Sequence, residues 1–119
     1  MSTDAADSAT IYHNPRCSKS RQALELLRDR GVEPTVVRYL DTPPTVDELR
    51  TLITDAGLTV RQAVRVKESE FTELGLLEAS DEALLEAMVA HPRLIERPFV
   101  VTGKGTRLAR PTSVVEEIL

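Results

Sequence analysis

The sequence contains one cysteine, Cys17, among its 119 residues. A single cysteine cannot form a disulfide within the chain, so the fold is not held by a disulfide framework. If Cys17 takes part in redox turnover, the second thiol has to come from another molecule.

Long hydrophobic runs are also missing. No apolar run approaches the roughly 20 residues that a helix needs to cross a bilayer. Residues 1–9, MSTDAADSA, are small, polar and acidic, and they have neither the basic start nor the apolar core of a signal peptide. We therefore expect a cytoplasmic protein with no membrane partner, in which residues 1–9 form a disordered tail.

Basic residues are not in excess. The chain has 15 Lys and Arg against 19 Asp and Glu, a net charge of −4, which argues against nucleic acid as a partner. Any anion site must therefore be formed by a local group of basic residues.

With 41% hydrophobic residues, the chain is long enough for one compact domain and too short for two.

The order of predicted elements indicates an α/β fold. Residues 10–13 read as a strand closed by the Asn-Pro turn, and residues 34–40 as a second, β-branched strand. The intervening helix ends at Gly31, with Ser18 or Ser20 as its cap. A strand, helix and strand joined in this way predict a parallel pair with a right-handed crossover.

The rest of the chain divides into a helical block and a hairpin. Thr45 as N-cap and Glu48 three residues later predict a helix that ends at Gly57. Further helices are expected over 60–66 and 81–90, the latter capped by Ser80 or Asp81 and ended near His91. Residues 97–111 read as a hairpin with a Gly-Lys-Gly turn, not as a phosphate loop, and 112–119 as a last helix.

The cysteine lies at a strand-to-helix junction, in the segment NPRCSKSR. A thiolate at a helix N-terminus is stabilised by unpaired amides and the helix dipole, which lower its pKa. Arg16, Lys19 and Arg21 add positive charge, and a protonated His13 would add more. The alternative is that Cys17 is a small buried hydrophobic residue and that the cations are simply solvated.

Ser20 stands where a Cys-x-x-Cys motif would place its second thiol. A serine cannot resolve a disulfide. Its hydroxyl could donate a hydrogen bond to the Cys17 thiolate, or it could only cap helix amides.

Several segments together resemble the glutaredoxin-coupled arsenate reductase family and its arsenate-reductase-like branch. They are IYHNPRCSKSR, EPTVVRYLDTPP, LTVRQAVR, HPRLIERPFVV and GTRLARP, and the likeness covers residues 10–119. The resemblance implies a single thioredoxin-like domain (β-α-β, helical insertion, β-β-α) with the insertion at about residues 45–92.

The resemblance also implies an active site. Cys17 corresponds to the nucleophile of the family and His13 to the histidine that helps to activate it. The oxyanion-binding arginines correspond to Arg65, with Arg61 as a near rival, and to Arg97 and Arg110. Ser20, Arg21 and Pro98 are supporting residues, and the Arg97-Pro98 bond is expected to be cis and to face the thiol. No metal and no bound cofactor are implied.

The implied reaction is the thiol-dependent reduction of arsenate to arsenite. Glutathione or another low-molecular-weight thiol acts as co-substrate, and a glutaredoxin-type protein reduces the mixed disulfide left on the cysteine. Arginine suits a tetrahedral oxyanion because it stays charged and offers a planar fork of donors. Two alternatives are a thiol oxidoreductase acting on glutathionylated proteins and a non-catalytic thioredoxin-like regulator that binds RNA polymerase.

Overall fold

The computed structural model describes residues 8–119, which form two compact units. The first contains the described residues up to Thr42 together with Arg97–Leu119, and the second contains Pro43–Glu96. The predicted element order of β-α-β, helices and β-β-α is confirmed. The insertion expected at residues 45–92 lies inside the second unit.

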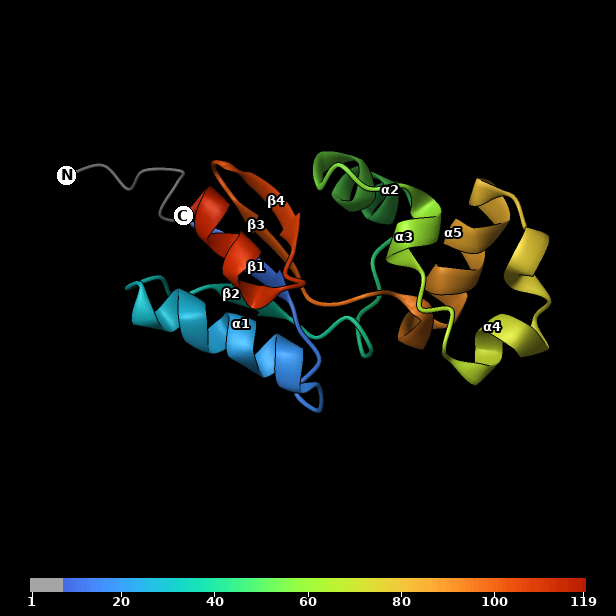
Figure 1. Ribbon diagram of the computed structural model, residues 1–119, viewed down its shortest axis with the longest axis horizontal. Coiled ribbons are helices and arrows are strands. Elements are labelled where there is room, and N and C mark those ends of the chain that lie inside the picture. Colours follow the sequence, from blue (N-terminus) through green and yellow to red (C-terminus); the bar gives the residue numbers. More distant parts are fainter. Residues whose placement is uncertain (1–7) are drawn as a thin grey trace. The chain divides into compact units, whose positions relative to one another are not determined.

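A four-stranded sheet forms the centre of the first unit (Figure 1). Its strands are β1 (Ala9–Tyr12), β2 (Thr35–Val37), β3 (Phe99–Thr102) and β4 (Gly105–Leu108). They lie in the order β2-β1-β3-β4. β1 and β2 are parallel, as predicted, whereas β3 is antiparallel to both of its neighbours.

The bounds of β1 and β2 differ from those predicted, residues 10–13 and 34–40. β1 begins at Ala9, whose side chain is buried, so Ala9 does not belong to a tail. The remaining part of the predicted tail, residues 1–7, lies outside the described residues. β2 ends at Val37 instead of Leu40 because the carbonyl of Arg38 accepts the amides of Asp41 and Thr42, which turns the chain.

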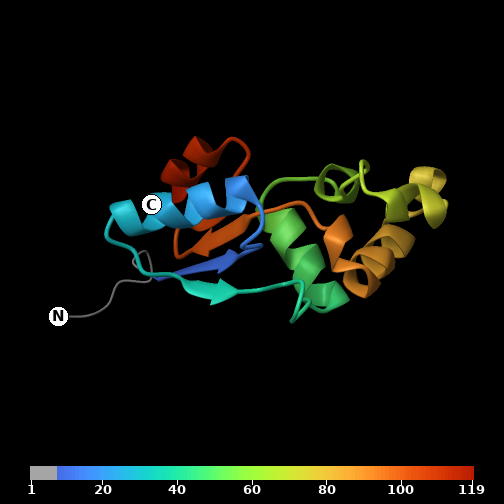
Figure 2. The same cartoon turned by 90° about the horizontal axis from the view of Figure 1, so that it is seen from below.

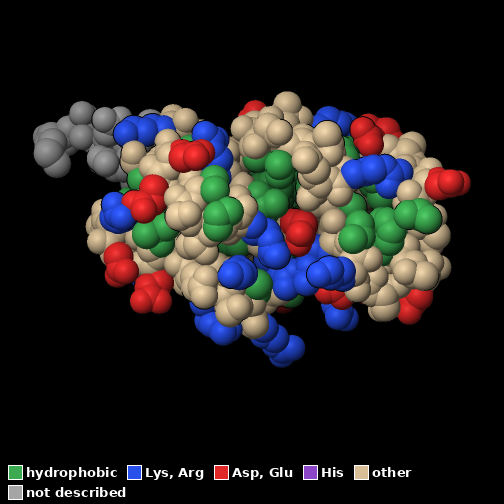
Figure 3. All heavy atoms as spheres, in the orientation of Figure 1, with side chains coloured by type: hydrophobic (Ala, Val, Ile, Leu, Met, Phe, Trp, Pro, Cys, Tyr) green, Lys and Arg blue, Asp and Glu red, His purple; other side chains and the backbone are tan. Residues whose placement is uncertain are grey.

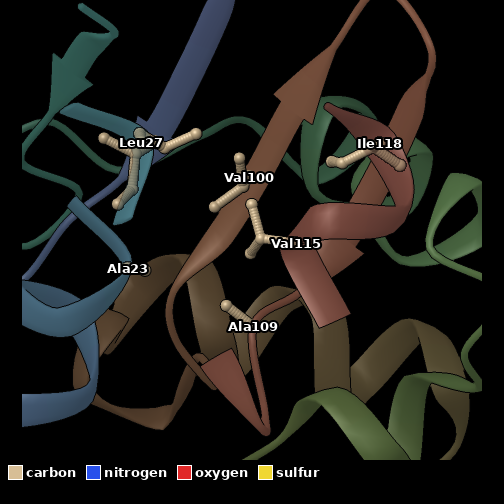
Figure 4. Close-up of a cluster of buried hydrophobic side chains, with 7 residues drawn as sticks. Ala23, Leu27, Val100, Ala109, Val115 and Ile118 are labelled. Atoms are coloured by element: carbon tan, nitrogen blue, oxygen red, sulfur yellow. The ribbon is translucent and has the colours of Figure 1, made fainter. Parts of the chain in front are cut away.

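Helix α1 (Ser18–Asp29) and the 3₁₀ helix η4 (Thr112–Ile118) cover the same face of the sheet (Figure 2). Their apolar side chains meet those of the strands in a buried cluster (Figure 4). In this cluster Leu27 of α1 and Val115 of η4 approach Val100 of β3. Burial of these aliphatic groups stabilises the unit by roughly 1.5–3 kcal/mol for each fully buried large side chain.

The β3–β4 hairpin is tighter than expected. Gly105 pairs with Thr102 in the ladder, so the turn consists of Gly103 and Lys104 alone. The Thr102 hydroxyl accepts the Lys104 amide at 3.1 Å and donates to the carbonyl of Ile118 at 2.6 Å. The hairpin is thereby tied to the end of η4.

The second unit contains helices. They are α2 (Val46–Asp55), α3 (Val60–Ala63), α4 (Ser69–Glu73), η2 (Leu76–Glu78), α5 (Asp81–Ala90) and η3 (Pro92–Leu94). The predicted capping box of Thr45 and Glu48 is present, and Ser80 caps α5. The helix expected over 60–66 ends at Ala63 because Val64 is extended and pairs with Ile95.

Basic and acidic side chains are interspersed on the face shown in Figure 3. Within residues 8–119, no helix has both the length and the apolar character that crossing a membrane requires.

Candidate active site

Cys17 is the N-cap residue of α1, so the prediction of Ser18 or Ser20 as the cap is wrong. Its amide donates to the carbonyl of Asn14 at 3.0 Å, and the side-chain oxygen of Asn14 accepts the Arg16 amide at 3.0 Å. These bonds hold residues 14–17 in a turn directly after β1. The partly buried sulfur of Cys17 therefore lies at a helix start, where the first amides have no acceptor within the helix.

The net effect of these surroundings is a lowered pKa for Cys17. Burial raises the pKa of the thiol, but it is outweighed by the Ser20 amide, by the charge and side-chain hydrogen bond of Arg97, and by the Lys19 amide. All three groups favour the thiolate over the thiol. The direction of this pKa shift is the one expected for Cys17, and its role as the nucleophile stays a prediction.

The source of the positive charge differs from the prediction. Arg97, from the segment before β3, provides the charge that lowers the pKa of Cys17. Lys19 acts through its backbone amide instead of its ammonium group. The guanidinium of Arg21 donates to the Pro15 carbonyl at 2.9 Å and so braces the turn.

Ser20 also acts differently from either expectation. Its hydroxyl is fully buried, lies 2.6 Å from Nδ1 of His13 and accepts the Asn14 amide at 3.0 Å. It is the Ser20 amide, not the hydroxyl, that bonds the Cys17 sulfur. The Ser20 hydroxyl thus bridges the buried His13 ring and the partly buried Asn14 amide.

The surroundings of His13 favour its neutral form. Burial lowers its pKa, and the charges of Arg38, Arg28 and Arg21 lower it further, which works against the additional positive charge expected from a protonated His13. The Ser20 hydroxyl accepts the Asn14 amide and also forms a hydrogen bond with Nδ1 of His13, so it fixes the position of the imidazole ring.

The hairpin brings Arg97 and Arg110 to the end of the sheet next to the cysteine turn. The register pairs Phe99 with Leu108, and the Ala109 amide bonds the Pro98 carbonyl at 2.9 Å, so the two arginines lie opposite each other. Nη1 of Arg110 lies 3.4 Å from the Arg97 carbonyl.

The proline bonds that follow these arginines are both cis. The Arg97-Pro98 bond was expected to be cis, and the Arg110-Pro111 bond is a second one that the sequence did not reveal. β1 pairs Tyr12 with Phe99, so the next residues along, His13 and Pro98, leave the sheet at the same end. This places the cis proline beside the turn that holds the cysteine.

Arg97 has donors that no described residue satisfies. Its Nε and Nη1 atoms are buried and have no hydrogen-bond partner in the part of the chain that the structure describes. Buried donors are nearly always paired, and an unpaired one costs about 1–3 kcal/mol. A guanidinium in this state, adjacent to a thiolate, is suited to bind an oxyanion.

Arg65 lies in the second unit, where Glu68 and Glu96 surround it at 2.5 Å and 3.4 Å. Its rival Arg61 donates to the carbonyls of Leu77 and Ala79, which it braces. A role for Arg65 in oxyanion binding stays a prediction.

No group of three or more His, Cys, Asp or Glu side chains within residues 8–119 is arranged to hold a metal.

Comparison with known proteins agrees with this arrangement. The model of the ArsC family matches residues 12–118. An arsenate reductase of Rhizobium meliloti is 58% identical over 112 residues, which cover 92% of this chain and 80% of that protein. An arsenate reductase of Escherichia coli K12 is 54% identical over 112 residues, which cover 92% of this chain and 79% of that protein.

Solved structures show the same fold. The arsenate reductase of Vibrio cholerae superimposes with a TM-score of 0.90 at 50% identity, covering 94% of this chain and 98% of that one. The fold is accordingly thioredoxin-like, with the helical insertion between its two halves. The family match and these sequence identities show that this chain belongs to the ArsC family.

Proposed function

We propose that this protein reduces arsenate to arsenite, with Cys17 as the nucleophile. The observation that supports this most directly is the pairing of a thiolate-stabilising helix start with the buried, unpaired donors of Arg97. Relatives that are 58% and 54% identical bear the name arsenate reductase. Thiolate chemistry and oxyanion binding are the two requirements of that reaction.

In the first step, arsenate binds to Arg97 and Arg110 of the first unit. Arsenate is a tetrahedral dianion near neutral pH, and planar guanidinium forks bind two of its oxygens at a time. The Nε and Nη1 atoms of Arg97 would gain the acceptors that they lack. Binding therefore relieves an unfavourable state of the free protein as well as placing arsenic near the sulfur.

In the second step, the Cys17 thiolate attacks arsenic and one arsenate oxygen leaves as water after protonation. A sulfur–arsenic bond forms and arsenic remains As(V). An external thiolate then attacks the Cys17 sulfur, the sulfur–arsenic bond breaks, and its electron pair stays on arsenic. Arsenite leaves as As(III), and Cys17 is left in a mixed disulfide.

Regeneration requires a second external thiol because the chain has no other cysteine. We propose glutathione as the low-molecular-weight thiol and a glutaredoxin-type protein as the reductant of the mixed disulfide. No resident cofactor is needed, since both electrons come from thiols. A cycle that consumes reduced thiols fits the reducing cytoplasm, which we propose as the compartment.

A coupled assay tests the proposal. NADPH oxidation is followed with arsenate, glutathione, glutaredoxin and glutathione reductase, using the wild-type protein and Cys17→Ser. We expect arsenate-dependent oxidation that Cys17→Ser abolishes. Equal turnover by Cys17→Ser would refute the proposal, and turnover with a glutathionylated protein but not with arsenate would favour the thiol oxidoreductase alternative.

A further inference from the structure

A pocket of about 260 Å³ lies beside the cysteine turn, within the first unit. One wall is the segment between β1 and α1, and the other is the turn that follows β2. Its lining residues are His13, Asn14, Pro15, Arg16, Arg38, Leu40 and Asp41. Because β1 and β2 are parallel neighbours, both segments leave the sheet at the carboxyl ends of their strands, where ligands of α/β proteins commonly bind.

The charges around this pocket favour an anionic group. Arg16 and Arg38 line it, and within residues 8–119 the Arg16 side chain has no ion-pair partner. Arg38 pairs with Asp41 at 3.6 Å, but both side chains are well exposed, at 62% and 69%. Exposed pairs of this kind are worth about 0–1 kcal/mol, so Arg38 can exchange its partner for a ligand carboxylate.

The pocket also offers an acceptor. Asp41, released from Arg38, can receive a ligand ammonium, and Leu40 and Pro15 add apolar surface. The pocket is therefore matched to a small zwitterion, whose carboxylate and ammonium meet opposite charges on one wall. Its volume is just below the roughly 300 Å³ at which small-molecule pockets begin, which suits one end of a small peptide.

The position of the pocket relates it to the thiol step. Asn14 and Arg16 line the pocket, and the carbonyl of Asn14 accepts the Cys17 amide at 3.0 Å. The pocket wall and the nucleophile thus belong to one hydrogen-bonded turn. The arginines assigned to the oxyanion, Arg97 and Arg110, are on the hairpin and do not line this pocket.

We propose that this pocket binds the zwitterionic end of the thiol co-substrate, with Arg38 as its principal carboxylate ligand and Arg16 assisting. This inference rests on the proposed function, because that function requires an external thiol. It predicts which thiols the protein prefers: thiols that carry a carboxylate are held beside Cys17, and neutral thiols are not.

The test uses disulfide exchange, which requires no arsenate. The Cys17 thiolate attacks oxidised glutathione, one sulfur–sulfur bond breaks and another forms, and one glutathione thiolate leaves, with no net oxidation. Intact-mass spectrometry measures this rate, and the rate with hydroxyethyl disulfide measures the intrinsic reactivity of the same thiol. S-methylglutathione, which cannot exchange, serves as a competitor.

For Arg38→Gln we expect the exchange rate with oxidised glutathione to fall about fivefold, equivalent to roughly 1 kcal/mol, and the rate with hydroxyethyl disulfide to stay the same. S-methylglutathione should slow exchange in the wild type and not in the variant. The matched control is Arg30→Gln, which removes another exposed charge of the same unit, one that pairs with Glu116. It should behave as the wild type.

Equal losses with both disulfides would overturn the proposal, because they would show that Arg38 acts on the thiol instead of the ligand. An unchanged rate with oxidised glutathione, or an equal loss in Arg30→Gln, would also overturn it. None of these outcomes depends on arsenate. A failure of arsenate turnover therefore remains distinguishable from a failure of this pocket.

Discussion

The reactivity of Cys17 depends on groups from two distant parts of the chain. The amides of Lys19 and Ser20 come from its own helix, and the charge comes from Arg97, eighty residues later in the sequence. The local part can be inferred from the motif, because a helix start after an Asn-Pro turn exposes amides. The contribution of Arg97 requires the register of β1 and β3, which no local pattern reveals.

Alkylation by iodoacetamide across pH tests the state of Cys17. The reaction rate should rise with pH to a midpoint below the ordinary cysteine value of about 8.5, because only the thiolate reacts. Arg97→Met should move this midpoint upward, since it removes the charge that lowers the pKa. A wild-type midpoint at or above the ordinary value would contradict the site as described.

Replacing Arg97 with Lys separates binding from stability. Lysine keeps the positive charge but lacks the planar pair of guanidinium donors. Arsenate turnover should therefore fall about 100-fold, as it does when an enzyme loses one hydrogen-bond donor to an oxyanion. The melting temperature should barely change, because Nε and Nη1 of Arg97 bond no described residue.

Arg110→Lys should behave in the same way as Arg97→Lys. Activity and thermal unfolding are measured on the same samples. Losses of stability that parallel the losses of activity would show instead that these arginines support the fold.

The lowered pKa of His13 predicts a pH-dependent stability. The unfolded chain binds the histidine proton first, so the free energy of unfolding should decrease as pH falls below the ordinary value of about 6.5. His13→Asn should lose less stability than the wild type between about pH 7.5 and about pH 5.5. Urea unfolding at both values measures this, and an identical pH dependence in the two proteins would contradict it.

At the scale of elements, the helix caps of the second unit were easier to predict than the lengths of elements, whereas the cap of α1 is Cys17 and not the expected Ser18 or Ser20. Thr45 with Glu48, and Ser80, were identified from spacing because a capping side chain satisfies amides within its own turn. The ends of β2 and α3 were not, because they depend on a turn at Arg38 and on the pairing of Val64 with Ile95. The short helix α4 has too few residues for a periodic pattern.

The capping box of α2 gives a test of the second unit. Thr45→Ala should lower the free energy of unfolding by about 1 kcal/mol, because the Glu48 amide loses its acceptor. Thr51→Ala, at an exposed position inside the same helix, serves as the control and should cost little. Urea unfolding compares the two, and equal costs would show that the box does not stabilise the helix.

At the scale of the whole molecule, the resemblance found in the sequence predicted the thioredoxin-like fold, with a β-α-β segment and a β-β-α segment on either side of the helical insertion. Cys17, Arg97 and Arg110 lie at one end of the sheet, as that reading requires. Among the features that the sequence did not reveal are the bond between His13 and Ser20 and the pocket formed with Arg38. The bond joins the residue after β1 to helix α1, and the pocket joins the segments that follow β1 and β2, so neither has a local pattern in the sequence.

The central claim is that one thiol per chain performs the reaction and ends in a disulfide with a small thiol. Intact-mass spectrometry after incubation with arsenate and glutathione, with glutaredoxin withheld, tests it most directly. We expect a single glutathione adduct per chain that requires arsenate and is absent from Cys17→Ser. Steady arsenite release without any external thiol, or a disulfide-linked dimer as the sole oxidised product, would contradict the account.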